Sequence, residues 1–174
     1  MNLDSVSKIL SVNDGSLPDI EFDFGEEKRS SMAYDLIQQQ ASCLSSQGAY
    51  YWSKSKEIEV PIKFGENPAE LVLSGEAEPF HVVFGGMRSN SGAIIPDLGL
   101  FILGSTQISL DYRMGKDWNR AAIEGLFELM LTLKCLAPNT KIRHVGNVFD
   151  ENDILLSAFE MWQTAHRIIE GNSK

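Results

Sequence analysis

Residues 100–112 read LFILGSTQISLDY, and they decide the fold class of the chain. The apolar run at 100–103 is short enough for a buried strand, and Gly104-Ser105 is a turn signal. After the turn, apolar and polar residues alternate through Tyr112, which is the period of a strand with one buried face. Strands joined by so short a connection pair antiparallel, so the sequence predicts an antiparallel meander.

The same period of two extends back to Tyr50 and recurs nearer the N-terminus. Alternation predicts strands over residues 58–64, over 69–74 and from Phe80 onward, with an earlier strand over 20–24. Pro61 cannot donate to a ladder of hydrogen bonds, so its strand is expected at a sheet edge or at a bulge. In all we expect a sheet of about five to six strands.

Helical periodicity precedes the main run of strands. A helix is predicted over 26–47, because Glu26 and Glu27 suit the dipole of its first turn and Gly48 suits a left-handed C-terminal cap. A shorter amphipathic helix fits residues 3–10. Cys43 falls inside the longer helix.

Two more helices follow the sheet. The first is capped by Asp117, and the second is capped by Asp150 or Asn152 and ends at Gly171, with a short strand at 142–145 between them. The predicted architecture is therefore α+β: an antiparallel meander with one helix before it and two after it packed on the sheet. We expect a single globular domain over residues 1–174.

Composition and charge exclude several classes of function. Of 174 residues, 43% are apolar and 22% charged, as in an ordinary globular protein. The longest apolar stretch, 93–103, is far shorter than the ~20 residues of a membrane-spanning helix. Lys plus Arg number 15 and Asp plus Glu number 24, so the net charge is 15 − 24 = −9. An acidic surface disfavours nucleic acid and anionic membranes and attracts a basic protein. The competing interpretation is that this charge only keeps the protein soluble.

The two cysteines and the N-terminus indicate a compartment. Cys43 and Cys135 are far apart and lie in predicted helices, so we expect buried, reduced thiols. The first residues lack a basic segment followed by an uninterrupted apolar run, so they do not resemble a secretory signal. Together these features predict a cytoplasmic protein.

No local motif carries chemistry. His81, His144 and His166 show neither HxH nor HExxH spacing, so we predict no metal site and no cofactor and expect structural or surface histidines. There is no GxSxG elbow, and both cysteines lie away from predicted helix N-termini. The glycine-rich segment 85–92 lacks the phosphate-loop pattern and is expected to be a flexible connection between two strands.

Two segments remain as candidates for a binding surface. Residues 111–118 combine charges and aromatics between a strand end and a helix start, where a scaffold commonly presents functional groups. The competing interpretation makes Asp117 a helix cap, pairs Arg113 with a carboxylate and buries Trp118. Tyr50-Tyr51-Trp52 alternate in a strand, so at least one of them should face away from the core unless a helix covers that side.

Three functional hypotheses follow. The first is a non-enzymatic acidic protein that binds and neutralises a protein partner, basic in character, as a bacterial toxin-immunity protein or a small inhibitor does. Its expected partner-binding residues lie on or beside connections: Tyr51, Trp52, Arg88, Asp111, Arg113 and Asp117.

The second hypothesis is a small enzyme whose site is assembled around residues 111–118 from Asp111, Arg113, Asp117 and one histidine. It requires a cleft that joins these groups. The third is a homodimeric ligand-binding or structural module that pairs through the edge containing Pro61 or through the Tyr50–Trp52 face.

Overall fold

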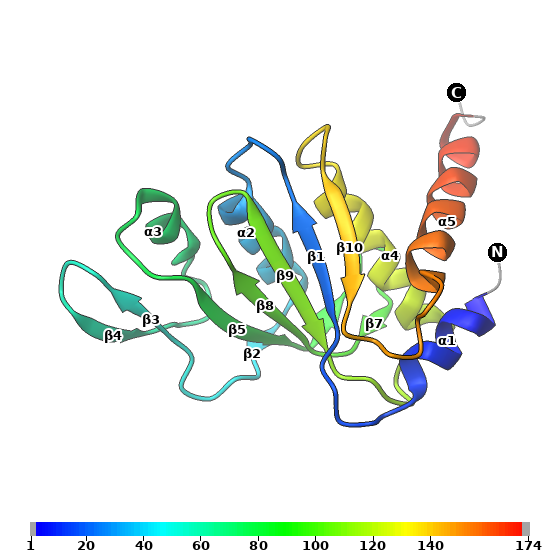
Figure 1. The fold of residues 1–174 in the computed structure, drawn as a ribbon, viewed down its shortest axis with the longest axis horizontal. Coiled ribbons are helices and arrows are strands. Elements are labelled where there is room, and N and C mark those ends of the chain that lie inside the picture. Colours follow the sequence, from blue (N-terminus) through cyan, green and yellow to red (C-terminus); the bar gives the residue numbers. More distant parts are fainter. Residues whose placement is uncertain (1–2, 172–174) are drawn as a thin grey trace.

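The protein, whose computed structural model describes residues 3–171, is organised around a six-stranded sheet (Figure 1). Every pair of neighbouring strands in this sheet is antiparallel, which confirms the predicted α+β class and the number of strands. In spatial order the strands are β10 (Lys141–Val145), β1 (Asp19–Asp23), β9 (Gln107–Tyr112), β8 (Leu98–Ile102), β5 (Phe80–Gly85) and β2 (Cys43–Leu44).

The N-terminal strand β1 lies inside the sheet. Strands β5, β8 and β9 are neighbours in chain order, as expected for a meander, whereas β1 pairs with β9 on one side and with β10 on the other. The position suits its side chains, because Ile20 and Phe22 are fully buried and lie opposite the apolar side chains of Leu110 and Ile108.

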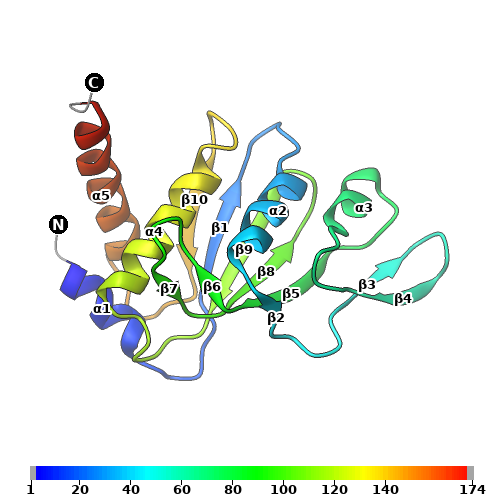
Figure 2. The same cartoon turned by 180° about the vertical axis from the view of Figure 1, so that it is seen from behind.

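The two faces of the sheet differ in character. Helices α2 (Ser30–Gln40) and α4 (Arg120–Lys134) cover one face (Figure 2), and α1 (Leu3–Ser11) and α5 (Ile154–Gly171) pack beside α4. Tyr34 of α2 meets the rings of Phe80 and Phe84 edge-on, at centroid distances of 6.1 and 5.3 Å. No described helix covers the other face, which is turned toward the reader in Figure 1.

One predicted strand is a helix. Residues 69–74 form α3 (Ala69–Ser74) because the Asn67 side chain accepts the Ala69 N–H (3.1 Å) and Pro68 supplies a helical φ of −73°. Gly75 then ends the helix in the left-handed conformation, with φ of 81°. Apolar residues in so short a segment fit both periods, which explains the wrong prediction.

The predicted helix over 26–47 is also shorter than expected. Helix α2 stops at Gln40, and the following residues form the edge strand β2, where Ser42 N–H donates to the Gly85 carbonyl (3.0 Å). Cys43 therefore lies on an edge strand and Cys135 at the end of α4, and both are exposed. The expectation that the two thiols are buried is wrong.

Two small ribbons complete the fold. Strands β3 (Tyr50–Ser53) and β4 (Ile58–Pro61) form a two-stranded sheet beyond the β5 edge, with Pro61 at the end of the outer strand as expected for an edge. Strands β6 (Met87–Arg88) and β7 (Ile94–Ile95) form a hairpin beside α4. No helix within residues 3–171 is long and apolar enough to cross a membrane.

Candidate functional site

The uncovered face of the sheet carries polar side chains in register. Strand alternation directs Asp19 and Glu21 of β1, Ser109 and Asp111 of β9, and His81 of β5 to this face, because their neighbours in sequence are buried under the helices. The backbone pairing sets Asp19 directly opposite Asp111. Residues separated by about 90 positions in the chain are therefore neighbours on one surface.

His81 and Asp111 are the central pair of this face. The Nε2 atom of His81 donates to Oδ1 of Asp111 over 2.7 Å, since a carboxylate oxygen can only accept. The imidazole also lies against the ring of Phe101, its partner on β8, with centroids 4.1 Å apart. The Asp111 side chain is nearly buried, whereas 33% of the His81 side chain is exposed. One edge of a positioned imidazole is thus open to a ligand.

Gly99 makes this contact possible. His81 and Asp111 belong to strands separated by β8, and they meet above Gly99 of that strand. A Cβ atom at position 99 would lie 1.8 Å from Oδ1 of Asp111 and 2.5 Å from Nε2 of His81. Gly99 has no positive φ, so its absent side chain, rather than its backbone conformation, is what the site requires.

Asp19 adds a second carboxylate beside Asp111. Ser109 donates its hydroxyl to Oδ1 of Asp19 over 2.8 Å. Burial raises the pKa of Asp19, and the charges of Asp111 and Glu21 raise it further, against the lowering effect of the Ser109 hydrogen bond. Two facing carboxylates repel each other, so the free energy of this surface falls when a positive charge approaches.

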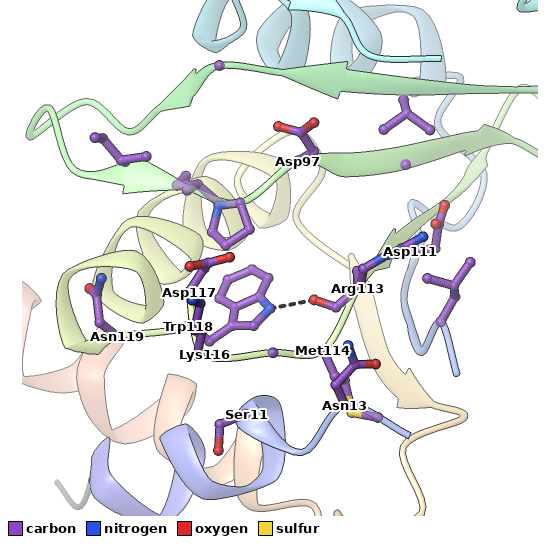
Figure 3. Close-up of a pocket in the computed structure, with 18 of the residues that line it drawn as sticks. Ser11, Asn13, Asp97, Asp111, Arg113, Met114, Lys116, Asp117, Trp118 and Asn119 are labelled. Atoms are coloured by element: carbon purple, nitrogen blue, oxygen red, sulfur yellow. Dashed lines mark hydrogen bonds between the residues drawn. The ribbon is translucent and has the colours of Figure 1, made fainter. Parts of the chain in front are cut away.

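A cleft of about 1090 Å³ opens beside the pair (Figure 3). His81, Asp111 and Gly99 line it from the sheet, and the 113–119 segment lines it from the side. Other walls come from the loop after α1 and from the β6–β7 hairpin. Leu17 of the loop is 52% exposed, and Ile94 of the hairpin is 64% exposed. The cleft therefore combines charged groups with exposed apolar side chains.

The 113–119 segment is held in place by buried contacts. The Trp118 indole N–H donates to the Arg113 carbonyl (2.9 Å), and the ring packs edge-on against Tyr112 in the core. The N-cap of α4 is Asn119, whose side chain accepts the Ala122 N–H (3.1 Å), so the expected cap at Asp117 is wrong. Because Asn119 performs the capping, Asp117 is left in the lining of the cleft.

The structure brings together only some of the six expected binding residues. Asp111, Arg113 and Asp117 all line the cleft, together with His81. Arg88 of β6 is exposed outside this lining, where it donates to the Gly92 carbonyl (3.4 Å). Tyr51 and Trp52 lie on the β3–β4 ribbon, which projects from the other end of the molecule (Figure 1).

The aromatic cluster on the ribbon divides between two environments. Tyr50 and Trp52 are exposed, as the alternation predicts for at least one of the three residues, whereas Tyr51 packs toward Phe80 with ring centroids 6.4 Å apart. The glycine-rich segment 85–92 does connect strands, but its end is anchored, because Ser91 N–H donates to the Glu128 carboxylate of α4 (3.0 Å). Neither the aromatic cluster nor this anchored end belongs to the cleft lining.

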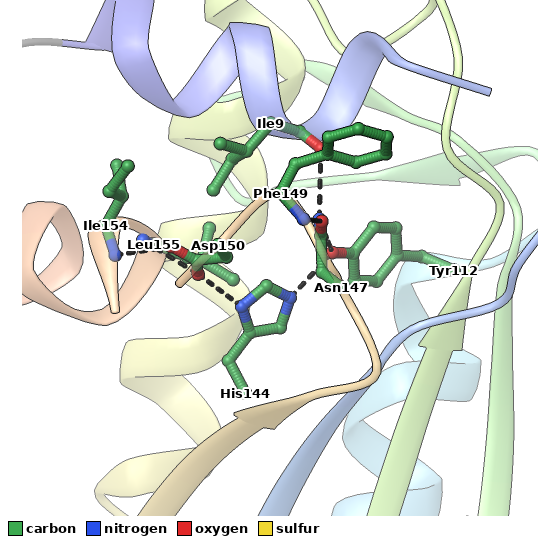
Figure 4. A network of polar contacts seen from close by, with 8 residues as sticks. All are labelled: Ile9, Tyr112, His144, Asn147, Phe149, Asp150, Ile154 and Leu155. Carbon is green, nitrogen blue, oxygen red and sulfur yellow. Dashed lines mark hydrogen bonds and ion pairs between the residues drawn. The ribbon is translucent and has the colours of Figure 1, made fainter. Parts of the chain in front are cut away.

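A second histidine forms a buried network (Figure 4). Nδ1 of His144 donates to Asp150 (2.6 Å), and the Tyr112 hydroxyl donates to Nε2 of the same ring (2.7 Å). Asn147 donates to the Tyr112 oxygen (3.2 Å) and to the Ile9 carbonyl of α1 (3.0 Å). The His144 and Asp150 side chains are only 1% and 2% exposed, so a ligand has no access to them.

This network has a structural role. Asp150 also accepts the backbone N–H groups of Ile154 (2.5 Å) and Leu155 (3.3 Å), which confirms the expected capping of α5 by Asp150. Burial raises the pKa of Tyr112, so its hydroxyl remains protonated and able to donate at neutral pH. The network thereby ties α1, β9, β10 and the start of α5 together.

The pairing of His81 with Asp111 was not predicted from the sequence. A usable signal was present: both residues occupy positions of opposite parity to the apolar residues of their strands, which assigns them to the same sheet face. Within the described part of the chain, no group of three or more His, Cys, Asp or Glu residues is arranged to hold a metal ion. Comparison of the chain with protein-family models, curated proteins and solved structures finds no match.

Proposed function

We propose that this chain is a binding protein whose cleft takes a basic, partly apolar segment of a protein partner and neutralises that partner by covering it. The observation that carries the proposal is the composition of the cleft. The lining includes exposed Leu17 and Ile94. Its charged side chains are three carboxylates and two cations, so negative charge is in excess by one: Asp97, Asp111, Asp117, Arg113 and Lys116. Apolar contact supplies affinity, and the carboxylates supply the preference for a cation.

The charge of the whole chain supports the same kind of partner. A net charge of −9 accelerates the approach of a basic protein and slows that of an acidic one. Asp19 faces Asp111 of the cleft across the sheet and adds a further negative charge beside the cleft. A wide, open cleft also suits a polypeptide segment better than a small molecule, which usually fills an enclosed pocket.

A defined peptide tests this function directly. The probe is a fluorescein-labelled peptide of alternating Lys, Arg and Leu, with a Glu-for-Lys/Arg peptide as the reverse-charge control. We expect fluorescence anisotropy to show binding of the basic peptide alone, weakening severalfold as sodium chloride rises from about 50 to about 300 mM. Equal binding of both peptides, or no binding of either, would contradict the proposal.

A matched pair of variants locates the binding surface. Asp111→Asn together with Asp117→Asn removes two charges from the cleft and is expected to weaken binding of the basic peptide by about tenfold. Glu26→Gln together with Glu151→Gln removes two exposed charges outside the cleft lining and should change the affinity less than about twofold. If both double variants bind alike, the peptide does not occupy the cleft.

One observation favours a second candidate, a small acid–base enzyme that uses the same cleft. The cleft joins His81, Asp111, Arg113 and Asp117, which is the condition that the enzyme hypothesis requires. Asp111 fixes the Nε2–H form of the imidazole, leaving Nδ1 of His81 free to accept a proton from water or a substrate hydroxyl. A thermal-shift screen of small metabolites separates the two candidates: an enzyme substrate should stabilise the wild-type protein more than His81→Gln.

A further inference from the structure

Across the sheet, His81 faces carboxylates of β9 and β1, whereas the intervening strand β8 places no charged side chain opposite it. Asp111 of β9 contacts it directly, and Asp19 of β1 lies within electrostatic range. Glu21 follows on β1, whereas the facing positions of β8 are Gly99 and Phe101. The charged residues of the adjoining cleft are Asp97, Arg113, Lys116 and Asp117, and the edge strand β2 contributes the exposed thiol of Cys43.

The ring is fixed at this position. It is held at one nitrogen by Asp111, it is covered on one side by Phe101, and it lies above Gly99. A proton taken up by Nδ1 of His81 therefore places a positive charge beside Asp111, with little freedom to move away. Histidine is the side chain whose charge ordinarily changes between about pH 5 and pH 8.

From this geometry we infer that the protonation of His81 controls the affinity of the cleft for its basic partner. With a neutral imidazole, the negative charge of Asp111 is not compensated, and it attracts a cationic side chain of the partner in the cleft. The imidazolium neutralises that carboxylate and repels the same cation. This inference rests on the proposed function of the cleft and adds a specificity-determining residue to it.

The sign of the effect follows from linkage. A partner that binds only the form with a neutral imidazole disfavours proton uptake, and by reciprocity protons weaken its binding. Because histidine side chains ordinarily change charge between about pH 5 and pH 8, complete exclusion of the imidazolium form raises Kd about tenfold between pH 8 and pH 5.5. The raised pKa of Asp19 adds a weakening of the same sign at the acidic end, because that carboxylate also loses charge as pH falls.

The other two histidines do not compete for this role. His144 is buried in the network with Asp150 and Tyr112 and is absent from the cleft lining. His166 lies on α5, where its Nδ1 contacts the Trp162 carbonyl (2.9 Å) and its ring stacks on the Trp162 indole. His166 is exposed and lies outside the cleft lining, so it serves as a matched control.

The test measures Kd for the labelled Lys/Arg/Leu peptide at about pH 8 and about pH 5.5, at constant ionic strength. The wild-type chain is compared with His81→Gln, whose amide can still donate a hydrogen bond to Asp111, and with His166→Gln. We expect about a tenfold rise of Kd on acidification for the wild type and for His166→Gln. For His81→Gln we expect a rise of no more than about threefold, from Asp19 and the other carboxylates.

The outcomes separate this inference from the proposed function. If the wild type binds the peptide at pH 8 and His81→Gln shows the same tenfold loss on acidification, the inference is overturned and the binding function stands. If the wild type fails to bind at pH 8, the proposed function and the inference fall together. Circular dichroism and a urea midpoint within error of the wild type confirm that His81→Gln remains folded, and His81→Asn provides a second variant that must give the same result.

Discussion

Gly99→Ala is the substitution that examines the site most directly. The added Cβ would lie 1.8 Å from Oδ1 of Asp111, 2.4 Å from its Cγ and 2.5 Å from Nε2 of His81. Real contacts at a Cβ do not come so close, so the two side chains must separate. Because the neighbouring atoms belong to side chains and not to backbone, we expect the strand to remain paired while the contact between His81 and Asp111 is lost.

The expected stability change is a balance of three effects. Forcing a methyl group into a packed position costs about 1–3 kcal/mol. Loss of the hydrogen bond between His81 and Asp111 adds about 0.5–1 kcal/mol, at the low end because one third of the histidine side chain is in solvent. Replacing a strand glycine by alanine stabilises the folded state by about 0.5–1 kcal/mol, because alanine loses less backbone entropy on folding. The central values of these contributions combine to a fall of about 2 kcal/mol in the free energy of unfolding.

Urea unfolding followed by tryptophan fluorescence measures this change, and nitrogen-15 spectra of the imidazoles report the His81 hydrogen bond. Gly104→Ala is the matched control, because a Cβ atom at position 104 would meet no atom within 4 Å and Gly104 has no positive φ. If Gly99→Ala unfolds at the urea midpoint of Gly104→Ala and the His81 nitrogen shifts stay at wild-type values, the argument that Gly99 makes room for the pair is wrong.

Three further predictions address other parts of the molecule. Asp19→Asn keeps an acceptor for Ser109 but removes the repulsion by Asp111, so it should stabilise the protein by about 0.5 kcal/mol at pH 7. Because the folded-state pKa of Asp19 is raised, this gain in stability should vanish as pH falls through that pKa. Urea titrations at several pH values measure the effect. Asp150→Ala should lower the free energy of unfolding by about 3 kcal/mol, since it removes a buried helix cap and leaves His144 without its acceptor. Glu151 is exposed, so Glu151→Ala should lower the free energy of unfolding by less than about 0.5 kcal/mol. Cys43 and Cys135 should both react with a thiol reagent such as dithionitrobenzoate in the native protein, and reaction only after denaturation would contradict their exposure.

The strands of the central sheet other than β2 were predictable because their signal is local. Alternation in 100–112 and in 20–24 identifies each strand and its buried side without reference to the rest of the chain. The start of α5 was predictable for the same reason, since the Asp150 carboxylate caps N–H groups only four and five residues away. The cleft residues Asp111, Arg113 and Asp117 were predictable because they lie at or just after the end of a strand.

Local signals failed where two structures compete for the same residues. Residues 69–74 contain apolar positions compatible with a strand, and the side chain of Asn67 and the rigid φ of Pro68 favour the helix. The segment after Gln40 retains helical spacing, but its backbone groups pair with the edge of β5. In both cases a few backbone hydrogen bonds outweigh a weak intrinsic preference.

The sequence by itself determined the class of the fold, most of the strands and the face to which each strand residue points, because these depend on neighbours within a few positions. Only the tertiary structure decided that β1 lies between β9 and β10 and that β8 lies between the strands of His81 and Asp111. The facing of Asp19 and Asp111, the meeting of His81 with Asp111 above Gly99, and the cleft beside them all follow from that strand order. Strand order depends on pairings between segments far apart in the chain, and alternation gives the face of a residue but not its neighbours across the sheet.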